Sequence, residues 1–115
     1  MSVVKKFTKK ISLRPTEQWK IVDEFPEYEV SDYARIRHIE TKVPLKQCTP
    51  FSKEGFWIVY FPDGSRKRER CVNHLVATHF VPNPNNWKFI QFVDGSRGNN
   101  DALNLMWRPL PKKRI

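Results

Sequence analysis

The chain has 115 residues, of which 39% are hydrophobic and 13% aromatic, and this allows one domain with a modest core. Its formal net charge of +9 favours a polyanionic partner, because basic clusters gain affinity by releasing counterions from a phosphate backbone. The bland alternative is that the charge only keeps a small protein soluble. Neither an apolar run of about 18 residues nor an apolar leader is present, so we expect a soluble protein that contacts no membrane.

The cysteine pattern gives no sign of a disulfide framework or a zinc knuckle. Cys48 and Cys71 are the only two cysteines and form no Cys-x-x-Cys pair. We expect no metal and no cofactor. A reducing compartment fits best, and we expect the cytoplasm of a bacterium or of a phage-infected cell. The Lys-rich, acid-free N-terminus leaves a mitochondrial address as an alternative.

Basic charge is concentrated at the two ends of the sequence. Residues 1–14 contain no acid, whereas residues 15–34 carry six acids against one lysine, so a basic surface must come from elsewhere. Basic arms on a small globular body are typical of proteins in ribonucleoprotein particles, which favours RNA over DNA and adds other proteins of a large assembly as partners. The predicted nucleic-acid contacts in the arms are Lys5, Lys6, Lys9, Lys10, Arg14, Lys112, Lys113 and Arg114.

Short strands are predicted in the first half of the chain. Residues 19–22 and 28–31 favour β-structure, with a turn at Phe25-Pro26 between them. In residues 35–38 the alternation puts Arg35 and Arg37 on one face of a strand. His38 beside them is either a phosphate contact or simply an exposed strand residue.

The strongest strand signal is GFWIVYF, residues 55–61. Asp63-Gly64 suits a tight hairpin, after which the chain returns as RKRERCV. A period of two along the return strand aligns Arg66, Arg68 and Arg70 on one face. The sequence therefore predicts a basic stripe held on a rigid element.

One helix is predicted from Val72 to Phe80, with Asn73 near its start available to satisfy free backbone donors and Val81-Pro82 ending it. In the loop that follows, Trp87 is a candidate for stacking on an exposed base. Residues 88–93 form a predicted strand, Asp94-Gly95 opens a turn, and residues 104–107 return as its partner. The predicted fold class is α+β, mostly antiparallel sheet with one central helix.

The histidines of this helix do not form a metal pair. His74 and His79 are five residues apart, roughly 140° around a helix axis, so they would not bind one ion directly. A zinc site that joins Cys71 to them is accordingly disfavoured.

Two co-linear patterns carry a family resemblance. EQWKIVDEFPEYEVSDYARIRH resembles the nuclease-associated modular motif, whose pattern is Trp-Lys, Tyr-Glu-Val-Ser and Arg-hydrophobic-Arg. VNHLVATHFVPNPNN followed by VDGSRGNNDALNLMW resembles the HNH homing-endonuclease family. The expected organisation is a basic arm over residues 1–14, a β-rich modular region over 15–71, a degenerate HNH-like region over 72–107 and a basic tail over 108–115.

The resemblance implies a ββα-metal nuclease in which a histidine deprotonates water and hard ligands hold one divalent ion. The family's first hairpin strand carries Asn-His-hydrophobic-Asp-Gly, and this chain reads Gln91-Phe92-Val93-Asp94-Gly95 at that place. Phenylalanine neither accepts a proton nor binds a metal. Gln91 offers only a neutral amide oxygen, which holds a hard dication poorly.

Two further departures are visible. The family continues from its Asn-Leu-x-Trp strand into a helix with the last metal ligand, whereas Pro109 and Pro111 disfavour a helix here. The family's Val-His-Arg-Leu appears as VNHL. Asn104 matches the family's catalytic asparagine, but without its partners we expect it to brace the hairpin. The retained framework residues are Asp94, Gly95, Asn99, Asn100, Asn104, Leu105 and Trp107.

The sequence therefore predicts a catalytically inactive, nuclease-derived nucleic-acid-binding protein, an RNA-binding component of a ribonucleoprotein assembly such as a ribosome. One alternative is an active metal-dependent HNH DNA endonuclease whose site a partner chain completes. Another is a protein-binding inhibitor of the kind phages make. Besides the arms, Trp87 and His38, the predicted phosphate contacts are Arg35, Arg37, Arg66, Arg68, Arg70 and Arg97.

Overall fold

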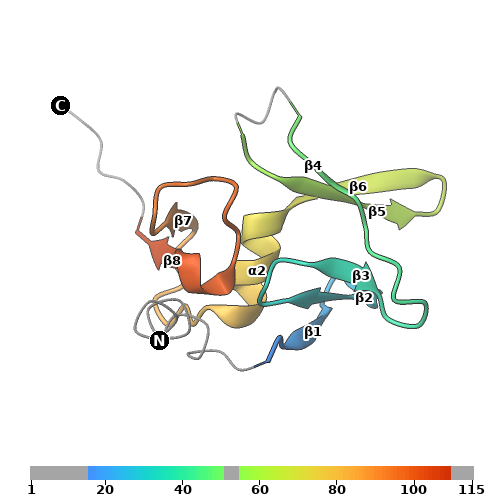
Figure 1. Ribbon diagram of the computed structural model, residues 1–115, viewed down its shortest axis with the longest axis horizontal. Helices are drawn as coiled ribbons and strands as arrows, with labels where there is room; N and C mark the ends of the chain where they lie inside the picture. The colour runs from blue at the N-terminus through green and yellow to red at the C-terminus, as the bar shows by residue number, and fades with distance from the viewer. Residues whose placement is uncertain (1–15, 51–54, 110–115) are drawn as a thin grey trace, which may run out of the picture.

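The computed structural model describes residues 16–50 and 55–109, in which three small antiparallel sheets surround one α-helix (Figure 1). The sheets have the strand orders β1-β2-β3, β4-β5-β6 and β7-β8. This architecture confirms the predicted α+β class. No helix in the described ranges is long and apolar enough to cross a membrane.

The first sheet contains β1 (Trp19–Val22), β2 (Phe25–Ser31) and β3 (Ile36–His38). Val22 pairs with Phe25, so the turn lies at Asp23-Glu24 and the predicted turn at Phe25-Pro26 is wrong. Pro26 is tolerated inside β2 because it lies next to the strand's first residue, beyond the regular pairing with β3 that runs from Tyr28 to Val30.

Ser31 organises the turn between β2 and β3. Its side chain is fully buried, and its hydroxyl oxygen accepts hydrogen bonds from the backbone N–H groups of Tyr33 and Arg35, both at 3.1 Å. The turn also holds Ala34 at a φ of 69°, a left-handed conformation that costs energy for a residue with a side chain. The serine of the Tyr-Glu-Val-Ser pattern is therefore a structural residue.

Replacing Ser31 with alanine should destabilise the protein by about 1–2 kcal/mol, because two backbone donors lose their acceptor. Urea denaturation followed by tryptophan fluorescence would measure the loss. Ser65→Ala, at the exposed turn between β5 and β6, is the matched control and should leave stability unchanged. Equal effects of the two substitutions would contradict this role for Ser31.

The second sheet contains β4 (Gln47–Cys48), β5 (Ile58–Asp63) and β6 (Arg66–Cys71). Asp63 pairs with Arg66, so the hairpin turn is Gly64-Ser65, one residue later than predicted. Gly64 has a φ of 64°, which glycine adopts without strain. The β5–β6 hairpin extends away from the helix (Figure 1).

The helix α2 spans Val72–Phe80, as predicted, and ends at Val81. Its N-cap is Cys71, and no side chain caps it, so the capping role expected of Asn73 is wrong. Instead the backbone N–H of Val72 donates to the carbonyl of Trp57 at 2.9 Å, which ties the helix start to the second sheet.

The third sheet is a hairpin of β7 (Phe89–Phe92) and β8 (Leu105–Arg108), preceded by the short 3-10 helix η2 (Ala102–Asn104). The predicted pairing of these segments is confirmed, with Phe92 opposite Leu105. The indole N–H of Trp107 donates to the carbonyl of Val81 at 3.1 Å and fastens the hairpin to the end of α2.

All three sheets and α2 contribute to one hydrophobic core. The helix provides the centre because its buried side chains face strands from each sheet. The buried members of the core are Val22, Val30, Ile36, Val59, Phe61, Val72, Leu75, Val76, Ala77, Phe92, Leu105 and Trp107.

Candidate nucleic-acid interface

Asn104 holds the long loop between β7 and β8 closed. Its Oδ1 accepts from the backbone N–H of Asp94 at 3.0 Å, and its Nδ2 donates to Asp94 Oδ1 and to the carbonyl of Asn99, both at 2.9 Å. Both amide protons are therefore occupied inside the protein. The expectation that Asn104 braces the hairpin is confirmed by these contacts.

The carboxylate of Asp94 is the other centre of this network. It accepts from the Asn99 side chain at 3.0 Å and from the backbone N–H of Ser96 at 2.8 Å, in addition to Asn104. These hydrogen bonds, the one from Asn99 first, lower the pKa of Asp94 below its usual value. The carboxylate thus stays ionised at neutral pH, and its hydrogen bonds stabilise the loop.

Phe92, at the position where the family has its general base, belongs to the core. It is 9% exposed, and its ring centroid lies 6.1 Å from that of Phe56. The guanidinium of Arg97 lies 4.7 Å from the centroid of the Phe56 ring on this side of the protein. Phe92, for which the resemblance implies a proton acceptor, therefore lies beside an aromatic and cationic cluster.

Few of the hairpin's described side chains are free to bind a divalent ion. Gln91 faces outward beside Met106, on the opposite side of the strand from Phe92. Asp94 is committed to the loop network, and no group of three or more His, Cys, Asp or Glu side chains in residues 16–50 and 55–109 is placed to hold an ion. The ionisable side chains of the described residues therefore form no ion site by themselves.

Neither helical histidine faces a shared site. His79 Nδ1 lies 2.8 Å from the carbonyl of Leu75, and its Nε2 accepts from the backbone N–H of Asp23 at 3.3 Å. His74 instead contacts the edge of Trp107, with ring centroids 5.9 Å apart. Partial desolvation lowers the pKa of His74, which favours its neutral form.

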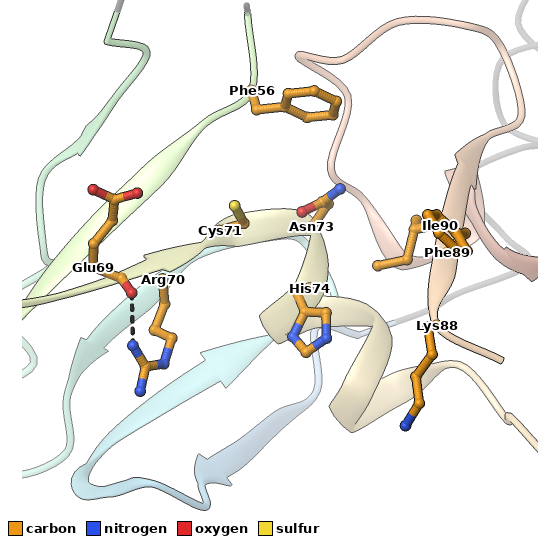
Figure 2. A pocket seen from close by; sticks show the side chains of 9 residues that line it. All are labelled: Phe56, Glu69, Arg70, Cys71, Asn73, His74, Lys88, Phe89 and Ile90. Carbon is orange, nitrogen blue, oxygen red and sulfur yellow. Dashed lines mark hydrogen bonds between the residues drawn. The ribbon is translucent and has the colours of Figure 1, made fainter. Parts of the chain in front are cut away.

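A cleft of about 370 Å³ opens between the end of β6, the start of α2 and β7 (Figure 2). Arg70 and His74 lie on one side, and Lys88 and Phe89 lie on the other. Of the predicted contacts that lie in residues 16–50 and 55–109, only Arg70 lines this cleft. Lys88 was missed because a lone lysine before a strand carries no sequence signal.

Arg35 and Arg37 lie on one side of the first sheet, as predicted. Both approach the ring of Trp19, with the guanidinium carbon of Arg37 3.6 Å and that of Arg35 5.3 Å from the ring centroid. Each is also paired with a carboxylate: Arg35 Nε donates to Glu17 at 2.8 Å, and Arg37 Nε donates to Glu29 at 2.6 Å. The hydrogen bond from Arg35 lowers the pKa of Glu17. Two arginines that were predicted to contact phosphate are thus already paired with carboxylates of the protein.

Arg68 and Arg70 of the predicted stripe share one face of β6, and both are paired with acids, whereas Arg66 at the hairpin turn lies apart from them. Arg70 makes a bidentate pair with Glu24, with both N–O distances 2.8 Å, and Arg68 pairs with Asp63 at 3.1 Å. Arg66, at the hairpin turn, has no carboxylate partner among the described residues. The unneutralised cation therefore lies at the far end of the stripe.

The remaining predicted contacts are scattered. His38 contacts Tyr28 edge to face, with centroids 5.2 Å apart, and accepts from the N–H of Thr41 at 3.3 Å. Trp87 is 37% exposed in a loop that Asn83 closes with two hydrogen bonds. The predicted contacts Lys5, Lys6, Lys9, Lys10, Arg14, Lys112, Lys113 and Arg114 lie outside the described residues.

Sequence reasoning missed the acids that pair with the arginines. Glu17, Glu24 and Glu29 were counted only as an acidic stretch, although they lie opposite cations across strands and turns. The alternation of charge along β2 opposite Arg37 was a signal for one of the three pairs.

The chain is similar in sequence to a known motif and to HNH endonucleases. The family model of the NUMOD4 motif matches residues 17–59. Two uncharacterized HNH endonucleases of Acanthamoeba polyphaga mimivirus are similar, one 31% identical over 91 residues and the other 30% identical over 99 residues. They cover 78% and 82% of this chain, which spans only 26% and 24% of their lengths.

A solved structure shares the fold over most of the described residues. It is that of the HNH homing endonuclease I-HmuI, described for DNA binding and cleavage. The two structures superpose with a TM-score of 0.69 at 26% sequence identity, over 80% of this chain and 52% of the other.

Proposed function

This chain belongs to the HNH homing-endonuclease family, and from that premise we propose that it is a DNA-binding protein which holds the phosphate backbone without cleaving it. The observation that carries the proposal is Phe92, a core phenylalanine at the position of the family's general base. Loss of a general base alone costs roughly 10²- to 10⁴-fold in rate. The second support is that no three His, Cys, Asp or Glu side chains of the described residues lie together to hold an ion, whose electrostatic stabilisation is the other contribution to cleavage.

The binding half of the proposal rests on charge and on the relatives. The net charge is +9, and the similar I-HmuI structure is described for DNA binding. The RNA-binding, ribonucleoprotein role predicted from the basic arms stays a prediction, since those arms lie outside the described residues. Duplex RNA should therefore be compared with duplex DNA in every binding experiment.

Cleavage is tested by nicking of a supercoiled plasmid in Mg²⁺ or Mn²⁺. We expect no metal-dependent nicking above that of a protein-free control. A mobility-shift assay with the same preparation should show binding that weakens steeply between about 50 and about 200 mM salt. Binding that does not change with salt would contradict a phosphate contact surface.

The competing function is an active DNA endonuclease, and one observation favours it: Asp94 and Asn104 keep an ordered arrangement at the hairpin. Metal-dependent nicking that is present in the wild type and lost in Asn104→Ala would establish this function. Nicking that persists in Asn104→Ala would identify a contaminating nuclease, because the family's catalytic asparagine would then be dispensable.

A further inference from the structure

A groove of about 510 Å³ lies on the outer side of the β4-β5-β6 sheet, and we call it the outer groove. In the β5–β6 pairing, Tyr60 lies opposite Glu69 and Pro62 opposite Lys67, so these side chains point away from the face that carries the core residues Val59 and Phe61. The volume is within the roughly 300–1,000 Å³ of ordinary ligand sites. The residues that matter here are Lys46, Cys48, Tyr60, Pro62, Arg66 and Lys67.

The outer groove is basic, and its charge is not neutralised. Lys46 and Lys67 line it, together with Arg66 from the hairpin turn, and no acid is among the described residues of its lining. None of the three has a carboxylate within 4.0 Å in the part of the chain that the structure describes. The opposite face of the same hairpin differs, since Arg68 and Arg70 are paired with Asp63 and Glu24 there. A polyanion therefore meets less internal competition in the outer groove.

An aromatic ring lies among these cations. Tyr60 is 40% exposed and is one of the residues that line the outer groove. A positively charged groove with an aromatic platform is the arrangement that binds unpaired nucleic acid, because a stacked base must expose its face. Paired bases in a duplex are already stacked and present no such face.

We propose that the outer groove binds an unpaired segment of DNA, with Lys46, Arg66 and Lys67 at its phosphates and one base stacked on Tyr60. The inference rests on the proposed DNA-binding function and names the surface and the form of DNA. It assigns phosphate contacts to Lys46 and Lys67, which sequence alternation did not single out, and to Arg66, which it did.

Fluorescence anisotropy with the full chain, a labelled 12-mer DNA strand and its duplex tests the proposal. Tyr60→Ala should weaken binding of the single strand roughly 5- to 100-fold, whereas Tyr60→Phe should keep it. Lys67→Gln should lower affinity and reduce the salt slope by about 0.7. Arg68→Gln is the matched control, since it is adjacent in sequence, faces the other way and is already paired; its effect should be smaller.

The two free thiols give a second readout that needs no substitution. Cys48 lines the outer groove and Cys71 lines the cleft at the start of α2, and both are half-buried. The single strand should slow alkylation of Cys48 and leave that of Cys71 unchanged.

The outcomes separate the two proposals. If the wild type binds no nucleic acid, both fall. If it binds DNA and the Tyr60→Ala and Lys67→Gln variants bind equally well, the outer-groove proposal fails alone. A duplex bound more tightly, with the same loss in Tyr60→Ala, would overturn the unpaired form. A single strand of RNA bound more tightly than DNA would overturn the choice of DNA.

Discussion

Replacing Phe92 with alanine should destabilise the protein by about 3–5 kcal/mol, the usual cost of removing a core phenylalanine. Phe92 is 9% exposed and packs with Phe56 in the same core as Leu105 and Trp107. Chemical denaturation followed by the fluorescence of the four tryptophans would measure the change in unfolding free energy.

A neighbouring phenylalanine provides the matched control. Phe89 lies on the same strand but is 40% exposed, so Phe89→Ala should cost less than about 1 kcal/mol. Equal losses in the two variants would show that Phe92 is not a core residue. In that case core packing would not explain why a phenylalanine stands at position 92 instead of a proton acceptor.

The variant that restores the family's histidine sharpens this test. Phe92→His should also be destabilised, because burial leaves the imidazole nitrogens without water and without a described partner. On the proposed function it should gain no metal-dependent nicking, since one histidine alone adds no cluster of three ionisable donors to the described residues. Nicking activity in Phe92→His would instead show that the rest of the site is intact and that a single residue silences it.

The elements that could be predicted from the sequence are those with clear periodicity. The bounds of α2 follow from the helical spacing of Leu75 and Val76 and from Val81-Pro82 at its end. These signals all lie within the helix or next to it in the sequence. The strands β5 and β6 follow from alternation and from the glycine between them. Residues close in sequence determine these elements, so the structure confirms the predicted helix and the two strands.

The predictions that failed depend on groups outside the local window. Phe25-Pro26 was predicted as a turn, but the stacking of Phe25 on Phe61, with centroids 4.3 Å apart, draws it into β2 and moves the turn to Asp23-Glu24. The helix start is satisfied by tertiary contact with Trp57, so Asn73 is not needed as a cap. In both cases a residue distant in the sequence, Phe61 or Trp57, determines the local structure.

The same reason limits what sequence says about a binding surface. Alternation identified the face that holds Arg68 and Arg70, but not that Asp63 and Glu24 neutralise it. Exposed ion pairs of this kind add little stability, about 0–1 kcal/mol. Their effect on binding is larger, because a phosphate must displace a carboxylate before it gains the arginine.

Substituting Asn104 with alanine should cost about 2–3 kcal/mol, because the backbone N–H of Asp94 and the carbonyl of Asn99 lose their partner in a half-buried network. Thermal and urea denaturation would measure the loss. Asn99→Ala is the matched control: it removes a single side-chain hydrogen bond to the exposed Asp94, so its effect should be clearly smaller. Equal effects of the two substitutions would contradict the bracing role of Asn104.

The pH dependence of the unfolding free energy tests whether the network stabilises the loop through the Asp94 carboxylate. Its hydrogen bonds lower the folded-state pKa, so the stability it contributes is present above the unfolded-state pKa of about 3.9 and is lost as pH falls through the lower folded value. Asn104→Asp places a second carboxylate beside the first and removes both donors. This variant should be less stable than Asn104→Ala at pH 7, and the difference between the two should shrink below about pH 4, where the carboxylates protonate. A difference that does not change with pH would mean that the loop is held by the backbone contacts alone.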